Sequence, residues 1–292
     1  MDVVRWDDRP ALRHPVLIAG FEGWNDAGDG ASTAVRYLAA SWNARPFATL
    51  DPDEFYDYTE VRPTVRLDDK QTRQIDWPEP ELSAAPMPGT RRDVVFLQAA
   101  EPQMRWRTYC SAIVDVATSL GVEFVLTLGA LLADVPHTRP VRVIGTSAGP
   151  ELARELDLIQ SRYEGPTGIT GVLHDAFHRA GVPSASLWAQ VPHYVAKTPS
   201  PKATLALVHR TASMLKTSVE TTDLEIAAAA YERQVTEVVA DDDDVSAYVR
   251  RLEEADDDGG TLDEPAMDEA DVPSADALAA EAERFLRDHR ND

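Results

Sequence analysis

The sequence predicts an α/β protein in which a mostly parallel or mixed sheet is covered by helices on both faces and followed by an acidic α-helical extension. Along residues 1–222, short apolar runs typical of buried strands alternate with stretches of helical periodicity. Such alternation is typical of parallel sheets whose crossovers are helices. From residue 223 the strand-like runs stop and acidic residues dominate. We therefore predict an α/β domain at 1–222 and an acidic helical appendage at 223–292.

The first strand and helix have the clearest signals. Residues 16–20 form an apolar run that predicts a buried strand, and a polar loop leads from it to a helix predicted over 29–42. One face of that helix is apolar at the spacing expected for packing against a sheet. The residues of this face are Ala31, Val35, Leu38, Ala39 and Trp42.

The remaining elements of the domain follow from the same patterns. Strands are predicted at 46–50, 93–98, 123–129, 141–146 and 185–191, and helices near 103–120, 150–160 and 168–180. Residues 61–67 and 71–77 flank a polar turn and predict a β-hairpin that projects from the main sheet. The proline-rich stretch 77–88 predicts a linker back into the body.

Composition and charge restrict the class of partner. The 292 residues carry a net charge of −22, and residues 223–292 hold 23 acidic against 6 basic residues. A negative field repels phosphate backbones and anionic lipids, so we expect neither nucleic acid nor membrane partners. Cys110 is the single cysteine, which excludes an internal disulfide. The start of the chain lacks the features of a secretory signal, so a cytoplasmic location is expected.

The appendage carries three apolar stripes at helical spacing. The first comprises Leu224, Ala228, Tyr231, Val235 and Val238; the second Val245, Tyr248, Val249 and Leu252; the third Leu278, Phe285 and Leu286. Isolated helices of this length are marginal in water, so we expect them to pack on one another or on a neighbour. Between the second and third stripes, residues near 253–272 are acidic and poor in large apolar side chains, which predicts a mobile loop.

The loop Gly20-Phe-Glu-Gly-Trp-Asn-Asp-Ala-Gly-Asp-Gly30 follows the first strand, where α/β proteins often bind ligands. Its three carboxylates, Glu22, Asp26 and Asp29, would repel a phosphate unless a divalent cation intervened. In a structural interpretation, Asp26 or Asp29 caps the following helix and Trp24 packs. In a functional one, the loop forms a binding edge around Phe21, Glu22, Trp24 and Asn25.

Two motifs resemble parts of catalytic sites, but each lacks a further element that its chemistry requires. Gly145-Thr-Ser-Ala-Gly149 matches the nucleophile elbow of hydrolases, with Asp175 and His193 in the order of a triad, but no oxyanion segment accompanies it. A tight turn with Ser147 near a helix N-cap is the alternative. His174 and His178 stand at i, i+4 like half a zinc site, yet spacing fixes no third ligand. We expect solvated histidines on the helix flank, no metal and no cofactor; a metal-dependent hydrolase through Glu22, Asp26 and His174 remains an alternative.

Two further segments are candidates for contact surfaces. In Gly165-Pro-Thr-Gly168-Ile-Thr-Gly171, glycine recurs every three residues, which allows close backbone approach to the sheet or across a subunit contact. His193 and Tyr194 follow the last predicted strand. They would border the same cleft, at the carboxyl ends of the strands, as the loop 20–30.

Taken together, three segments resemble the PAC2 family, relatives of the proteasome assembly chaperones, in its actinobacterial branch. They are Gly20–Gly28, Ser161–Ile169 together with Gly171–Ala176, and Trp188–Tyr194. The resemblance implies a three-layer α/β/α body of the phosphorylase/hydrolase-like type, a C-terminal helical extension, and homo-oligomers with a trimer as one form. Family members that dock on the proteasome use a C-terminal hydrophobic-Tyr-X tail. This sequence ends His289-Arg-Asn-Asp292, so docking through that tail is not expected.

These observations favour a non-catalytic, oligomeric protein-binding module whose partners are further copies of itself and other, proteasome-related proteins. The candidate interaction residues are Phe21, Glu22, Trp24, Asn25, Asp26, Gly165, Pro166, Thr167, Gly168, His193 and Tyr194. The alternative is a small-molecule-binding protein or hydrolase that uses the cleft at the carboxyl ends of the strands.

Overall fold

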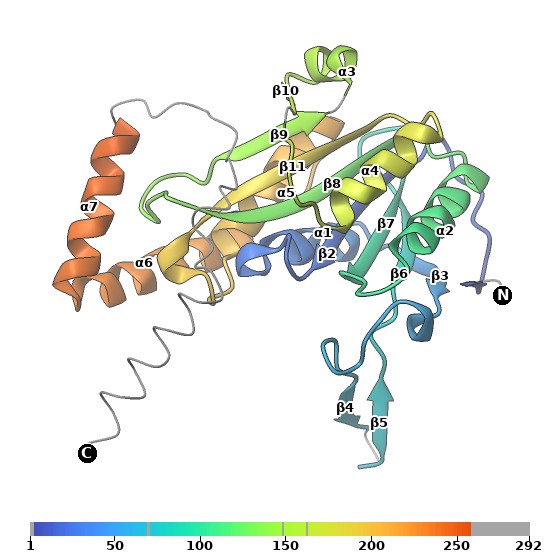
Figure 1. The fold of residues 1–292 in the computed structure, drawn as a ribbon, viewed down its shortest axis with the longest axis horizontal. Helices are drawn as coiled ribbons and strands as arrows, with labels where there is room; N and C mark the ends of the chain where they lie inside the picture. Colours follow the sequence, from blue (N-terminus) through green and yellow to red (C-terminus); the bar gives the residue numbers. More distant parts are fainter. Residues whose placement is uncertain (1–2, 69–70, 148, 162, 258–292) are drawn as a thin grey trace. The chain divides into compact units, whose positions relative to one another are not determined.

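The computed structural model describes residues 3–68, 71–147, 149–161 and 163–257. The described residues up to 161 and from 167 onward form one compact unit, and residues 163–166 belong to a second. A mixed sheet of nine strands, in the order β1-β3-β6-β7-β2-β8-β11-β9-β10, runs through the first unit (Figure 1). The strands are β1 (Val4–Trp6), β2 (Val16–Glu22), β3 (Arg45–Leu50), β6 (Glu81–Pro86), β7 (Asp93–Ala100), β8 (Phe124–Ala133), β9 (Val143–Ser147), β10 (Ile159–Gln160) and β11 (Ser184–Pro192).

Helices cover both faces of this sheet, which confirms the three-layer α/β/α body. The helices are η1 (Ala27–Asp29), α1 (Gly30–Ser41), η2 (Pro52–Glu54), α2 (Trp106–Ser119), α3 (Pro150–Glu155), α4 (Ile169–Arg179), η3 (His193–Val195), α5 (Pro201–Leu215), α6 (Thr222–Ala240) and α7 (Asp243–Asp257). Helices α1 and α5 pack on one face, and α2 and α4 on the other.

Four parallel strands, β7, β2, β8 and β11, form the centre of the sheet. Side chains alternate between faces along a strand, so Val16 and Ile18 of β2 pack towards α1 whereas Leu17 and Ala19 pack towards α2. Because both faces are covered, β2 reads as a continuous apolar run in the sequence.

Strand β6 corrects the linker expected at 77–88. Residues 81–86 pair with β7 on one side and β3 on the other, with Leu82 opposite Leu97 and next to Ala48. The prolines at 78, 80, 86 and 88 stand before, at the end of and after this strand, where the missing N–H costs little. The expected linker is therefore an internal strand.

The hairpin is confirmed as a separate two-stranded sheet. It consists of β4 (Thr64–Leu67) and β5 (Arg73–Asp76), which pair antiparallel with Val65 opposite Ile75. Figure 1 shows it projecting from the nine-stranded sheet. Every one of its eight strand residues is exposed.

The start of the acidic extension is helical and packs against the domain through α6, which lies along α5. Helix α6 buries Leu224, Ala228, Tyr231, Val235 and Val239. Val238, expected in this stripe, is 70% exposed, because the buried face continues from Val235 at i+4 and not at i+3.

Helix α7 continues to Asp257, so its last turn takes up residues that we predict as the start of a mobile loop. The rest of that loop and the third helix lie outside the described residues, and the domain boundary at 222 remains a prediction. In the part of the chain that the structure describes, no helix has the length and apolarity needed to span a bilayer.

Candidate functional site

Asp26 caps helix α1 from inside the loop that follows β2. Its Oδ1 accepts hydrogen bonds from the backbone amides of Ala31 (2.6 Å) and Ser32 (3.2 Å). Burial raises the pKa of this carboxyl, and hydrogen bonds from the Ser32 side chain and from the two backbone amides oppose that shift. Asp26 thus serves the structural role of a helix cap.

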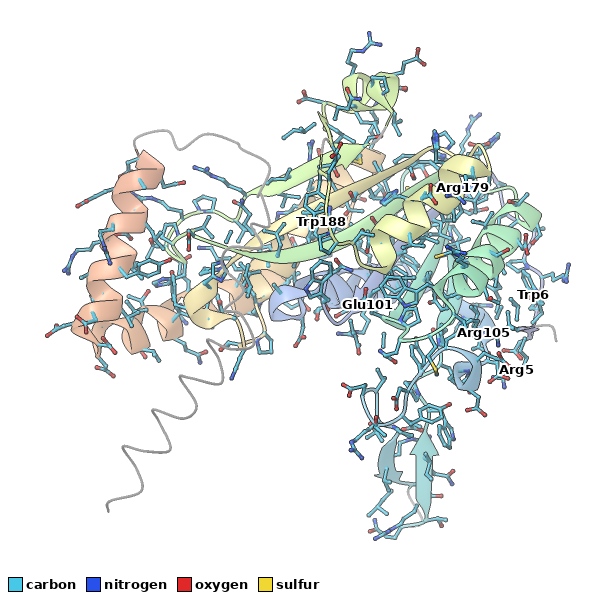
Figure 2. The ribbon with its side chains drawn as sticks, in the orientation of Figure 1. Arg5, Trp6, Glu101, Arg105, Arg179 and Trp188 are labelled. Atoms are coloured by element: carbon cyan, nitrogen blue, oxygen red, sulfur yellow. The ribbon has the colours of Figure 1, made fainter. Side chains whose placement is uncertain are left out.

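Glu101, at the end of β7, joins two of the segments singled out in the sequence. Its Oε1 accepts a hydrogen bond from the backbone amide of Ile169 at 2.8 Å and one from the Asn25 side chain at 3.4 Å (Glu101 is labelled in Figure 2). The amide of Ile169 is at the start of α4, where a carboxylate also meets the positive end of the helix dipole. The backbone amide of Glu101 in turn donates to the carbonyl of Glu22 at 2.8 Å.

Gly168 leaves room for these side chains at the junction. A Cβ at Gly168 would lie 2.3 Å from the Asn25 Nδ2 and 2.8 Å from the Glu101 Oε1. The glycine-rich entry to α4 and the loop after β2, which hold the candidate residues Gly168 and Asn25, therefore meet around Glu101. Glu101 itself was missed, because a single acidic residue before a proline has no motif; its position directly after a strand is the available signal.

The other loop residues have different environments. Phe21 is buried against Tyr109, with ring centroids 6.3 Å apart, so it belongs to the core and is not retained as a binding residue. Glu22 is exposed and forms an ion pair with Arg36. Trp24 is 53% exposed, which contradicts its expected packing role and leaves it available for contact.

The glycine-rich segment is divided between the two units. Thr167 is exposed and Gly168 buried in the main unit, whereas Gly165 and Pro166 belong to the short second unit. Within that second unit the Tyr163 hydroxyl donates to the carbonyl of Pro166 at 2.8 Å.

His193 and Tyr194 lie in η3, directly after β11. His193 is exposed. The Tyr194 hydroxyl accepts from the backbone amide of His137 at 2.6 Å and contacts the His137 Nδ1 at 2.8 Å, while the His137 Nε2 lies 3.0 Å from the Thr236 hydroxyl. Burial and the nearby Lys202 lower the pKa of His137, which favours the neutral ring. His137 and Lys202 were missed in the sequence because they stand alone, outside any motif.

Ser147 does not form a triad with Asp175 and His193. Strand β9 runs antiparallel to β11, so the end of β9 lies beside the start of β11, and the Ser147 hydroxyl donates to the Ser184 carbonyl at 3.2 Å. His193 follows the other end of β11, nine residues or roughly 30 Å further along. Asp175 is exposed and pairs with Arg179. Ser147, Asp175 and His193 therefore form no catalytic triad.

His174 corrects the expectation of two solvated histidines. Its Nε2 lies 2.9 Å from the Thr127 hydroxyl and its Nδ1 2.7 Å from that of Ser184, so both ring nitrogens are engaged, whereas His178 is exposed. Glu22 is held by Arg36 and Asp26 by α1, and neither approaches His174 in these contacts. Within the described ranges, no three histidine, cysteine or acidic side chains cluster as a metal site would require.

Comparison with known proteins places this geometry in a family. The family model described as PAC2 family matches residues 20–239. The chain belongs to the PAC2 family. No curated protein matches it.

Two actinobacterial structures resemble this PAC2 chain closely. A PAC2 family protein from Streptomyces avermitilis is 48% identical, with a TM-score of 0.76, covering 80% of this chain and 99% of its own. A proteasome-assembly chaperone homologue from Mycobacterium tuberculosis is also 48% identical, with a TM-score of 0.73 and the same coverage. An archaeal proteasome activator from Pyrococcus furiosus is 17% identical with a TM-score of 0.66, covering 80% of this chain and 97% of its own, and shares the fold.

We expect replacement of Glu101 by alanine to lower the free energy of unfolding of the PAC2 protein by about 1–3 kcal/mol, because it strips a hydrogen-bond acceptor from the first turn of α4. Glu22→Ala removes a glutamate at the neighbouring strand end whose ion pair is exposed, and should cost less than about 1 kcal/mol. Urea unfolding of both variants measures the difference. Equal losses would mean that the Glu101 contact with α4 contributes nothing specific.

Proposed function

We propose that this PAC2 protein is a non-catalytic, homo-oligomeric protein-binding module that takes part in the assembly of a proteasome-related complex. The observation that carries the proposal is the apolar face of the hairpin. Val65, Leu67 and Ile75 are 57%, 54% and 54% exposed, and Trp77, just after β5, is 48% exposed. A cluster of large apolar side chains open to water is typical of a protein-binding surface.

The register of the hairpin gathers these side chains on one face. Val65 stands directly opposite Ile75, and Leu67, two residues further along, points to the same side. The other face is polar and carries an ion pair between Arg66 and Asp76 at 2.7 Å. An amphipathic hairpin without a core beneath it needs an outside partner, since two strands alone are marginally stable in water.

Trp77 extends the same surface. Its ring packs at 4.9 Å from that of Tyr58, which fixes its position while leaving about half of it exposed. Partly buried tryptophans that are held in place are frequent anchors of protein interfaces.

The relation to proteasome assembly rests on similarity. One of the 48% identical relatives is described as a proteasome-assembly chaperone homologue, and it aligns over 99% of its length. We infer a related role for this chain and assign self-association to the hairpin face.

Light scattering tests the self-association. The wild-type chain should have a mass of at least twice 32.1 kDa at micromolar concentration. The variant Val65→Ser/Ile75→Ser should be a monomer, because the cross-strand apolar pair is lost. A matched variant of the polar face, Thr64→Ser/Gln74→Ser, should keep the wild-type mass. A monomeric wild type would refute the assignment.

The assembly role is tested separately by affinity capture from the native host. Proteasome subunits should be recovered with the wild-type chain at least several-fold above a capture with an unrelated acidic protein. Recovery at the background level would argue against a proteasome partner, whatever the oligomeric state.

A further inference from the structure

A second surface, unrelated to the hairpin, lies where the loop between β8 and β9 meets α5, α6 and α7. Figure 1 shows this loop and α7 at the same end of the sheet. A narrow pocket is present there, with a cavity volume of about 20 Å³, which is room for about one water molecule. Its lining includes His137, Arg139, Arg142, Lys202, Tyr231 and Asp256.

The pocket is cationic, and α7 supplies most of the counter-charges. Arg142 pairs with Asp256, and Arg139 pairs with Asp257 at 2.8 Å. Lys202 pairs with Glu232 of α6. Two of the three cations of the pocket are therefore neutralised by carboxylates from the last turn of α7.

Two more contacts fasten α7 to the same loop. The Tyr248 hydroxyl donates to Asp134 at 2.7 Å, and the Thr138 hydroxyl donates to Glu253 at 2.5 Å. The β8–β9 loop thus binds one face of an acidic helix that carries six acidic and two basic residues over 15 positions.

Gln190 provides an independent indication of a ligand. Its Oε1, in the lining of the pocket, is buried and has no hydrogen-bond partner among the described residues. Tyr231, which also lines the pocket and is only 6% exposed, has its hydroxyl next to the side chain of Ser200. Leaving a buried polar group unsatisfied costs free energy, so such groups mark a place where a polar partner belongs.

Helix α7 is attached to the pocket by few buried contacts. Val249 is the one residue of α7 that is buried, in a small cluster with Tyr231, Val235 and Val239 that is separate from the two main cores. The ion pairs of Arg139 and Arg142 are partly exposed, and pairs of this kind contribute little each. In addition, α7 lies beyond residues 20–239, the extent of the family domain, whereas the other walls of the pocket lie within it.

We propose that this pocket is a docking site for an acidic helix of a partner protein, and that α7 occupies it within the same chain as a displaceable competitor. Charge complementarity argues for the occupant: the guanidinium groups of Arg139 and Arg142 suit side-chain carboxylates, and in the structure each of them pairs with a carboxylate of α7. The inference does not depend on self-association through the hairpin, because it involves none of the hairpin residues.

A labelled peptide tests the proposal with the full-length protein. The probe is a fluorescein-labelled peptide with the sequence of residues 243–257, and binding is followed by fluorescence anisotropy. The variant Asp256→Asn/Asp257→Asn loosens α7 and should bind the peptide roughly tenfold more tightly than the wild type, because a larger fraction of the sites is free. The control Asp244→Asn/Glu254→Gln changes the net charge equally at exposed positions outside the pocket lining, and should bind as the wild type does.

The arginines provide the second arm. Adding Arg139→Gln/Arg142→Gln to the loosened variant should weaken peptide binding at least tenfold, and a peptide with its six carboxylates replaced by amides should not bind. Circular dichroism melts exclude variants that fail to fold. Equal affinity of all variants, or no peptide binding to the loosened one, would overturn the proposal. A doubled mass without peptide binding would also overturn it, in favour of an exchange of α7 between two copies.

Discussion

Replacing Gly129 with alanine is expected to lower the free energy of unfolding by about 2–3 kcal/mol. Gly129 of β8 is in register with Trp188 of β11, and an added Cβ would lie 2.4 Å from the tryptophan ring. The indole nitrogen donates to the Ser186 hydroxyl at 3.0 Å, which holds the ring across the neighbouring strand (Trp188 is labelled in Figure 2). The ring would have to leave this position, or the two strands would have to separate.

Gly149→Ala is the matched control. Gly149 has a φ of −85°, and a Cβ there would lie 3.9 Å from its nearest neighbour, in Leu152. Its effect should stay within about 0.5 kcal/mol. Urea unfolding followed by tryptophan fluorescence and circular dichroism measures both variants. If Gly129→Ala is as stable as the control, Trp188 is free to move and the proposed clash is wrong.

The second large effect is a loss of stability in acid that originates at His174. Burial lowers the pKa of this ring to about 4, from 6.5 in an exposed histidine. The folded protein therefore favours the neutral ring, and His174 stabilises it fully above pH 6.5. As the pH falls from 6.5 towards 4, the unfolded chain takes up a proton that the folded one does not. The loss amounts to about 3 kcal/mol at most, since one pKa unit corresponds to about 1.4 kcal/mol.

His174→Gln isolates this contribution. The variant removes the titrating group but keeps polar atoms near Thr127 and Ser184. It should be less stable than the wild type at pH 7.5, because the contacts of the imidazole ring are lost. Its free energy of unfolding should fall less on acidification, because no buried histidine titrates at this position. Unfolding free energies at pH 7.5, 5.5 and 4.5 give the two slopes. Parallel curves for the two proteins would show that His174 titrates normally. His178→Gln, at an exposed position, should follow the wild type.

Local patterns were sufficient for the elements that are buried on both faces or on one regular face. The continuous apolar run of β2 predicts a strand that is buried on both faces, and the i, i+4 spacing of α1 predicts a helix that is buried on one face. Both elements form as predicted. Strand β6 has weaker signals, since Ser83 and Ala84 are small and prolines surround it. Its place in the sheet depends on pairing with β3 and β7, which lie more than thirty and about ten residues away, and a local window does not contain them.

The site shows the same limit. Asn25 and Gly168 were both candidate interaction residues, because both stand where a strand or loop leads into a helix, but their contact around Glu101 follows only from the structure. The triad order of Ser147, Asp175 and His193 is not realised in the fold, because the apolar run of β9 does not reveal that this strand is antiparallel to β11. The pocket around Arg139 and Arg142 was missed because its acidic counterparts are more than a hundred residues away in sequence.

The position of β2 at the middle of the sheet has a consequence during synthesis on the ribosome. Val16 pairs with Val94 of β7 and Phe124 of β8, so its two partners are made 78 and 108 residues later. At roughly 5–20 residues per second, β2 waits roughly 5–20 s for its second partner. During that time its six apolar or small residues, buried in the finished protein, have no sheet to join. The nascent chain therefore exposes an apolar core strand during this interval, and a factor that shields residues 16–21 until β8 has emerged would raise the yield of folded protein.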